Sequence, residues 1–165
     1  MTGAEIIKLS KERGVEVTVF LDKLRIQAEG EPDDSLIQLL RDHKQEVINA
    51  LLEAETEPDR WRRRLAEKIE TFMRMRALSR HEAEYEAFQH LVVERLNATH
   101  PNTDHRSCAE CGGRETAAAQ LLPFGVGDRH AWLHERCRDP WAEARRKDAV
   151  EALAAMGMRG RPKEG

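Results

Sequence analysis

Hydrophobic and polar positions change their period within the first third of the chain. Apolar residues recur at helical spacing up to Gly14, after the pair Thr2 and Glu5, which is typical of a capping box. The spacing then becomes two, which predicts a β-hairpin with one buried face and a tight turn at Asp22-Lys23. The apolar positions of this hairpin are Val15, Val17, Val19, Leu24, Ile26 and Ala28.

Two short amphipathic helices are predicted after the hairpin, with a break between them near Asp42-His43. Asp33 or Asp34 is expected to cap the first of them, because aspartate accepts hydrogen bonds from the free N–H groups at a helix start. Helix, hairpin, helix and helix make a compact unit over residues 1–54 if the hairpin packs its apolar face on the helices. The apolar positions of the two helices are Leu36, Ile37, Leu39, Leu40, Val47, Ile48, Leu51 and Leu52.

This first unit resembles a known family of small domains. The stretch from Gly3 to Leu52, with its helix-Gly-Val start, DKLRI hairpin and LRDHKQEVINALL ending, is similar to the TubC-type N-terminal docking domains of nonribosomal peptide synthetases. The resemblance implies that the hairpin, from Val15 to Ala28, accepts a short segment of a partner protein and that the unit can self-associate. Such capture would use strand addition at an open sheet edge. Alternatively, the hairpin only completes its own core.

Residues 58–98 predict two antiparallel helices joined by a short turn. Pro58 opens the first helix, and a capping box of Ser79 and Glu82 opens the second. The first helix has a basic side, which is either a solvated helix face or a phosphate-binding surface. We expect the pair to be a spacer or a dimerisation element. The basic residues are Arg62, Arg63, Arg64, Lys68, Arg74 and Arg76.

Two pairs of metal-ligand residues follow within residues 105–157. Cys108 and Cys111 form a CxxC pair followed by two glycines, as in a zinc knuckle. His134 and Cys137 form an HxxC pair, which on one helical turn would place both donors on the same side. A short hairpin is predicted between the pairs and a helix after them. This is the order of a treble-clef zinc finger, which the region resembles.

Alternatives remain for the fourth ligand and for the CxxC pair. His130 and His105 compete with His134, which in the absence of an ion would be an ordinary interface histidine. A redox CxxC pair is expected to follow a strand and to open a helix, and the CGG sequence at Cys111 fits neither position. We therefore favour one zinc ion held by Cys108, Cys111, His134 and Cys137.

The predicted zinc is structural rather than catalytic. Three thiolates and one imidazole close the tetrahedron and leave no position for water. Glu135 directly follows His134, whereas a deaminase needs an HxE arrangement, and the chain after His134 has no histidine or asparagine to complete a treble-clef nuclease. The chain also has no phosphate-binding loop, nucleophile elbow or pair of catalytic carboxylates. The sequence thus predicts a protein that is not an enzyme and has no catalytic residues.

The C-terminal part carries two further resemblances. LPFG, HAWLH and the helix ending in AALAAMGM are similar to the C-terminal part of small proteins from bacterial chromosomes and mobile elements, and this similarity implies no activity. Residues 158–165 are predicted to be a disordered basic tail. Within it Arg159, Arg161 and Lys163 resemble an AT-hook, which implies contact with the minor groove of DNA. Glu164 departs from that motif, and a merely solubilising tail is the alternative.

Composition limits the classes of function. The net charge of −3 on 165 residues is nearly balanced, which argues against a nucleic-acid binder that uses the whole surface. No apolar run is long enough to span a bilayer and the N-terminus is charged, so we expect a cytoplasmic protein whose three cysteines bind metal. The predicted fold is α+β and mainly α. The predicted function is that of a zinc-stabilised adaptor that docks a protein partner. The alternative is a DNA-binding accessory protein, and a zinc hydrolase is the third hypothesis.

Overall fold

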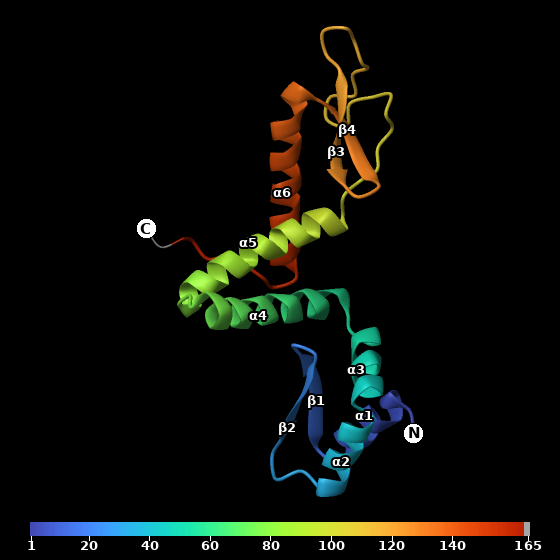
Figure 1. The fold of residues 1–165 in the computed structure, drawn as a ribbon, viewed down its shortest axis with the longest axis vertical. Helices are drawn as coiled ribbons and strands as arrows, with labels where there is room; N and C mark the ends of the chain where they lie inside the picture. The colour runs from blue at the N-terminus through green and yellow to red at the C-terminus, as the bar shows by residue number, and fades with distance from the viewer. Residues whose placement is uncertain (164–165) are drawn as a thin grey trace. The chain divides into compact units, whose positions relative to one another are not determined.

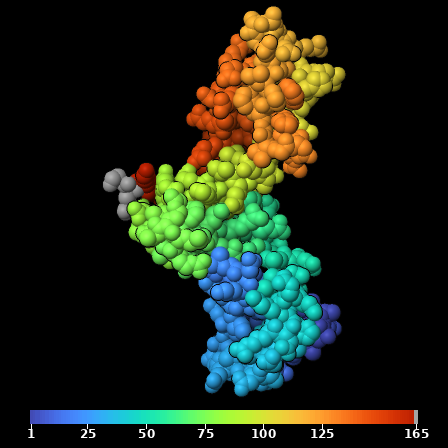
Figure 2. Space-filling view, in the orientation of Figure 1, coloured from blue at the N-terminus to red at the C-terminus, as the bar shows by residue number. Residues whose placement is uncertain are grey.

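The computed structural model describes residues 1–163 and has an α+β fold that is mainly helical. Figure 1 shows its elements and Figure 2 its surface in the same view. The chain divides into two compact units, residues 1–67 and a second unit from Lys68 onward. No described helix is both long and apolar enough to cross a membrane. The elements are α1 (Gly3–Glu12), β1 (Val15–Phe20), β2 (Lys23–Ala28), α2 (Asp34–Asp42), α3 (Lys44–Glu53), α4 (Glu57–Arg76), α5 (Arg80–Ala98), β3 (Leu121–Val126), β4 (Arg129–His134), η1 (Glu135–Cys137) and α6 (Arg138–Ala155).

The first unit has its core between one strand of the hairpin and the helices. Val15, Val17 and Val19 on β1 are at most 8% exposed. Their cross-strand partners on β2 include Ile26 and Ala28, which are both exposed. The buried face predicted for the hairpin is therefore present on β1, whereas most of β2 lies open. The helical side of this core consists of Ile6, Leu36, Leu40 and Val47.

A two-residue turn joins the two strands one position earlier than the sequence indicated. Leu21 and Asp22 form the turn, and Lys23 already belongs to β2. Both turn residues have positive φ angles, 48° and 56°, which is the requirement of a type I′ turn. This turn type matches the right-handed twist of the strands, so it keeps their pairing in register up to the turn.

The first turns of α4 belong to the first unit. Arg63 pairs with Glu55 at 2.8 Å and with Glu67 at 3.2 Å. Glu67 also accepts a hydrogen bond of 2.9 Å from the backbone N–H of Leu21 in the hairpin turn. Arg63 was expected on an exposed basic face, but its side chain is only 22% exposed because this ion pair covers it. The start of α4 is thereby fastened to the hairpin.

Within the second unit, the end of α4 and α5 run antiparallel, as the sequence predicted. The rings of Phe72 and His90 lie edge to face with centroids 5.0 Å apart. Lys68, one turn earlier on α4, pairs with Glu94, one turn later on α5. The predicted capping box at Ser79 is also present at the start of α5.

Helix α6 packs against α5 through apolar and polar contacts. Leu91 on α5 and Leu153 on α6 are fully buried. Arg145 on α6 donates hydrogen bonds to the carbonyl oxygens of Leu96 and Thr99 at the end of α5, at 3.1 and 3.2 Å. These carbonyl groups have no partner within their own helix, so Arg145 satisfies them while it fixes α6 beside α5.

The C-terminal segment contacts α5 instead of extending freely. Met158 is only 4% exposed. A Cβ atom at Gly160 would lie 2.6 Å from the ring of Phe88, so the backbone lies directly on that ring. The predicted disordered tail therefore begins with residues that pack on the helix. Glu164 and Gly165, the end of that tail, lie outside the described residues.

We predict that Gly3 does not tolerate a side chain. A Cβ atom at Gly3 would lie 2.2 Å from the carbonyl oxygen of Glu46, because the backbones of α1 and α3 approach closely. Gly3→Ala should lower the free energy of unfolding by about 3 kcal/mol, measured by urea denaturation. Gly30→Ala is the matched control, because nothing lies within 4 Å of that Cβ position. Equal effects of the two substitutions would contradict the prediction.

Candidate metal centre

The loop that carries the first ligand pair is held by its own backbone. The N–H of Gly112 donates to the carbonyl oxygen of Cys108, and the N–H of Cys108 donates to that of Gly113, both at 2.8 Å. Gly112 has a φ of 71°, where a side chain is unfavourable. A Cβ atom at Gly113 would lie 3.3 Å from both Cys111 Sγ and His134 Cε1. One glycine therefore permits the turn, and the other permits the close approach of two ligands.

Hydrogen bonds attach this loop to the second hairpin. β3 and β4 pair antiparallel around a two-residue turn. The N–H of Thr103 donates to the carbonyl oxygen of His130, and the N–H of Ala109 donates to that of Trp132, both at 2.9 Å. The segment that leads into the CxxC loop therefore runs along the outer edge of β4. Because β4 ends at His134, this edge contact brings the loop beside His134.

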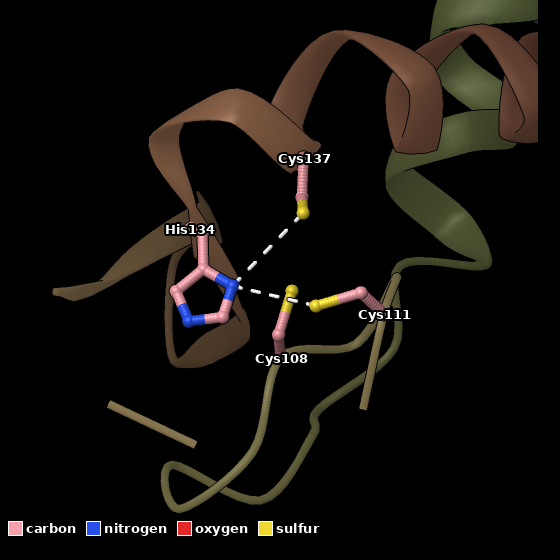
Figure 3. A group of neighbouring side chains, drawn as sticks. All are labelled: Cys108, Cys111, His134 and Cys137. Atoms are coloured by element: carbon pink, nitrogen blue, oxygen red, sulfur yellow. Dashed lines mark hydrogen bonds between the residues drawn. The ribbon is translucent and has the colours of Figure 1, made fainter. Parts of the chain in front are cut away.

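The second ligand pair lies where β4 gives way to α6. His134 is the last residue of β4, and Cys137 ends the short turn η1 directly before α6. The sequence predicted both residues on one helical turn. In the structure His134 keeps an extended backbone, with φ −67° and ψ 148°. The single 3-10 turn that follows brings Cys137 to the same side as the imidazole (Figure 3).

Four side chains converge between the CxxC loop and this turn (Figure 3). The ligand atoms of Cys108, Cys111, His134 and Cys137 lie within 4.8 Å of one another, so the cluster could hold one metal ion. Nδ1 of His134 is 3.4 Å from Cys111 Sγ and 4.0 Å from Cys137 Sγ. A tetrahedral ion with metal–sulfur distances of about 2.3 Å separates its ligand atoms by roughly 3.6–3.8 Å. These two distances lie on either side of this range, and the set of four donors is compatible with four-coordinate binding.

His134 directs its Nδ1 atom at the thiols. The residue is 4% exposed, and its Nε2 lies 3.2 Å from the carbonyl oxygen of Arg114. A carbonyl oxygen only accepts hydrogen bonds, so Nε2 donates, and the neutral ring carries its lone pair on Nδ1. A carbonyl partner of this kind orients many metal-binding histidines. Sequence reasoning missed Arg114 because its backbone makes the contact, and no residue-type signal marks a carbonyl group.

The thiol groups influence one another's ionisation. Burial by itself would raise the pKa of Cys108, but backbone N–H groups of Cys111, His134 and Glu110 lower that pKa to about 6. Burial raises the pKa of Cys137 to about 11, and the neighbouring sulfur atoms of Cys108 and Cys111 contribute to this rise. One thiolate therefore forms readily, whereas a further negative charge beside it is unfavourable. A bound divalent cation would offset that repulsion.

The other two candidate histidines are not members of the cluster. The side chain of His105 is 73% exposed and lies 3.6 Å from a carboxylate oxygen of Asp104. His130 contributes its backbone to the edge contact with Thr103. Neither histidine belongs to a metal-sized group among the described residues. Among the three candidates, the structure brings only His134 to the cysteines.

The cluster also forms part of a small apolar core. Cys108 and Cys137 are buried together with Leu121, Ala131 and Leu133, whereas Cys111 is exposed. Phe124, Trp132 and Trp141 pack around this group while remaining partly exposed. Three sulfur atoms and an imidazole nitrogen suit a borderline or soft cation. The arrangement can therefore bind an ion in the interior of a module with few other buried side chains.

The remaining predicted site residues lie elsewhere in the chain. The apolar hairpin residues belong to the first unit, where the valines of β1 are buried and Leu24, Ile26 and Ala28 on β2 are half-buried or exposed. Arg159 and Lys163 of the tail are exposed. Arg161 pairs with Glu84 of α5 at 2.8 Å.

We predict that metal binding to the cluster strengthens as pH rises. Cys137, with its pKa of about 11, is a protonated thiol at pH 7 and must lose that proton to become a ligand. Protons therefore compete with the ion, and the affinity for Co²⁺ or Zn²⁺ should rise about tenfold or more per pH unit between pH 7 and 8. Competition titrations with a chromophoric chelator measure this slope. An affinity independent of pH would show that the thiols are not the ligands.

Comparisons with known proteins add no relative to this picture. No family model, no curated protein and no solved structure matches the chain. The donor set, its geometry and the surfaces of the two units are therefore the basis for a function.

Proposed function

We propose that the protein is a non-enzymatic adaptor whose C-terminal module contains one structural zinc ion. The observation that carries the proposal is the convergence of Cys108, Cys111, His134 and Cys137 within 4.8 Å. The Nδ1 lone pair of His134, fixed by the carbonyl group of Arg114, supports it independently. As an adaptor, the protein would bind its partner through the hairpin of the first unit.

Zinc is the ion that best suits this donor set. Cys₃His sites in proteins are tetrahedral, and Zn²⁺ accepts thiolate and imidazole ligands without demanding another geometry. Four protein ligands leave no position for a water molecule, and three thiolates reduce the Lewis acidity of the ion. The site therefore suits stabilisation rather than hydrolysis. The few buried residues around it, Leu121, Ala131 and Leu133, are a reason for the module to need an ion.

The order of elements supports a treble-clef arrangement. The CxxC loop comes first, the β3–β4 hairpin follows, and Cys137 directly precedes α6. Each ligand pair is thus presented by a different local structure, a glycine-supported turn and a strand-to-helix junction. An ion at this point would connect elements that have little apolar surface to hold them together.

The hairpin of the first unit is the docking surface that we propose. Val15, Val17 and Val19 are buried, so their side chains are not available to a partner. Ile26 is 36% exposed and Ala28 is exposed, although both stand opposite buried valines on the same face of the sheet. A partner segment that pairs with β2 as an additional strand would cover these exposed apolar residues.

Several basic residues already interact with acidic or aromatic side chains of the same chain, and this favours an adaptor over a DNA-binding protein. Arg62 pairs with Asp59 at 2.7 Å, and Arg64 lies over the ring of Trp61. Arg161, the central basic residue of the AT-hook-like stretch, pairs with Glu84. A phosphate group would have to replace these intramolecular partners. Each replacement reduces the free energy that nucleic-acid binding can gain.

Metal analysis of the purified chain tests the zinc centre. We expect one zinc ion per chain in the wild type and no tightly bound zinc in Cys108→Ser, because a thiolate ligand is lost. His134→Ala should weaken zinc binding by at least tenfold, whereas His105→Ala, which alters an exposed histidine outside the cluster, should not. Removal of the ion by a chelator should reduce the near-UV signal of Trp132 and Trp141. A wild-type chain without zinc would refute the proposal.

Affinity capture tests the docking surface. The tagged wild-type chain is expected to retain a protein partner from its source cells, and Ile26→Asp should lose that partner because it places a charge on the apolar strip. Met75→Asp is the matched control, because Met75 is 74% exposed and belongs to the second unit. Circular dichroism verifies that both variants fold. Equal capture by the wild type and Ile26→Asp would exclude the hairpin as the docking surface.

A further inference from the structure

The four residues of the metal cluster differ in their access to solvent. Cys111 is exposed, whereas each of the other three is at most 7% exposed. The two residues that follow Cys111 are glycines, which have no side chain to cover its sulfur atom. A small solute therefore reaches the cluster first at Cys111.

The loop holds Cys108 and Cys111 at a spacing that permits a disulfide. The hydrogen bond of 2.8 Å from the N–H of Gly112 to the carbonyl oxygen of Cys108 closes a tight turn. Such a turn keeps Cα atoms three positions apart within roughly 7 Å, which is the limit for two cysteines that form a disulfide. The ligand atoms of the cluster lie within 4.8 Å of one another (Figure 3). A disulfide between these two cysteines therefore needs no movement of a helix or strand.

Cys137 is a less favourable partner for Cys111. It belongs to a different local structure, the η1 turn directly before α6, and it is buried in the small core of the module. A disulfide with Cys137 would pull the CxxC loop toward the start of α6. The N–H of Ala109 donates to the carbonyl oxygen of Trp132 at 2.9 Å, which holds the loop beside β4 and opposes this movement.

We propose that Cys111 is the site at which hydroperoxides oxidise the cluster, and that a Cys108–Cys111 disulfide forms with release of the zinc ion. This inference rests on the proposed zinc centre and extends it to a chemical signal that the centre detects. It is distinct from a catalytic redox pair, because the disulfide forms once per chain and a reductant is needed to restore the thiols.

The oxidation consumes one peroxide and two thiolates. The Cys111 thiolate attacks one oxygen of hydrogen peroxide, so that an S–O bond forms, the O–O bond breaks, and the departing hydroxide takes a proton to become water. The Cys108 thiolate then attacks the sulfur of the resulting sulfenic acid. The S–S bond forms, the S–O bond breaks, and a second water leaves after protonation. Two electrons pass from the sulfur atoms to the peroxide, and the ion leaves as Zn²⁺ because two of its four donors are lost.

The structure favours a reversible response. Loss of the ion removes the link between the CxxC loop and the start of α6, whereas the hydrogen bonds that hold the loop beside β4 involve no sulfur atom. The loop therefore keeps its place, and Cys137 remains a thiol. Reduction of the disulfide then regenerates all four donors at positions where a new ion can bind.

Peptide mapping of the zinc-loaded chain tests which cysteines react. Trypsin cleaves after arginine, so Cys108 and Cys111 share the peptide 107–114, whereas Cys137 begins another peptide. After limited treatment with hydrogen peroxide and alkylation of the remaining thiols, the peptide 107–114 should have lost two hydrogen atoms and Cys137 should be alkylated. A chromophoric chelator should record about one zinc ion released per disulfide. Dithiothreitol and added zinc should restore the bound ion.

Two histidine variants separate the exposed cysteine from a buried one. Cys111→His and Cys137→His each leave two thiolates and two imidazoles, which is also a tetrahedral zinc donor set. Cys137→His keeps the CxxC pair and should release zinc at about the wild-type rate when peroxide is added. Cys111→His lacks the exposed thiol and should release zinc at least roughly tenfold more slowly.

Three results would overturn the proposal while the zinc centre stands. They are bound zinc that resists peroxide at concentrations that oxidise free cysteine, a disulfide that includes Cys137, and equal release rates from the two histidine variants. A wild-type chain purified without zinc would refute the zinc centre itself, and this inference with it. The wild-type peptide map decides the question even where a histidine variant does not retain its zinc.

Discussion

Three sulfur atoms and one imidazole nitrogen converge where the CxxC loop, β4 and the start of α6 meet, and this group could hold one metal ion. The ligand atoms lie within 4.8 Å of one another. The pKa of Cys137, raised to about 11 by burial and by the other thiols, reflects the difficulty of placing several negative charges there. The surrounding apolar core is small, since only Leu121, Ala131 and Leu133 are buried with the cysteines. A bound cation would offset the repulsion among the thiolates.

The position of Cys137 gives this centre an influence beyond its own loop. Cys137 directly precedes α6, so an ion held there would fix the start of that helix. Further along, Arg145 binds the carbonyl groups at the end of α5, and Leu153 is buried against that helix. After α6 ends, Met158 is buried as well. α6 thus connects the residues of the cluster with α5 through polar and apolar contacts.

The two hairpins of the chain illustrate how similar strands acquire different roles. Both have six-residue strands joined by a two-residue turn. In the second hairpin one edge is occupied by the segment before the CxxC loop, and Pro123 interrupts the other. In the first hairpin, β1 turns toward the helices and β2 keeps free backbone groups beside the exposed Ile26. An open strand edge can pair with another chain, and between these two hairpins the first one therefore supports the proposed docking role.

The sequence by itself determined most of the helices and strands and the three cysteines of the cluster, Cys108, Cys111 and Cys137. Local signals were sufficient for these, because capping boxes, a period of two and CxxC spacing act between residues near each other in the chain. The sequence also left His105, His130 and His134 as competing ligands, since each lies at a plausible distance along the chain. Only the tertiary structure decided among them, because the edge contact of β4 brings His134 alone to the cysteines. Long-range packing likewise left most of β2 exposed and placed Met158 on the helical core, because neither result depends on neighbouring residues in sequence.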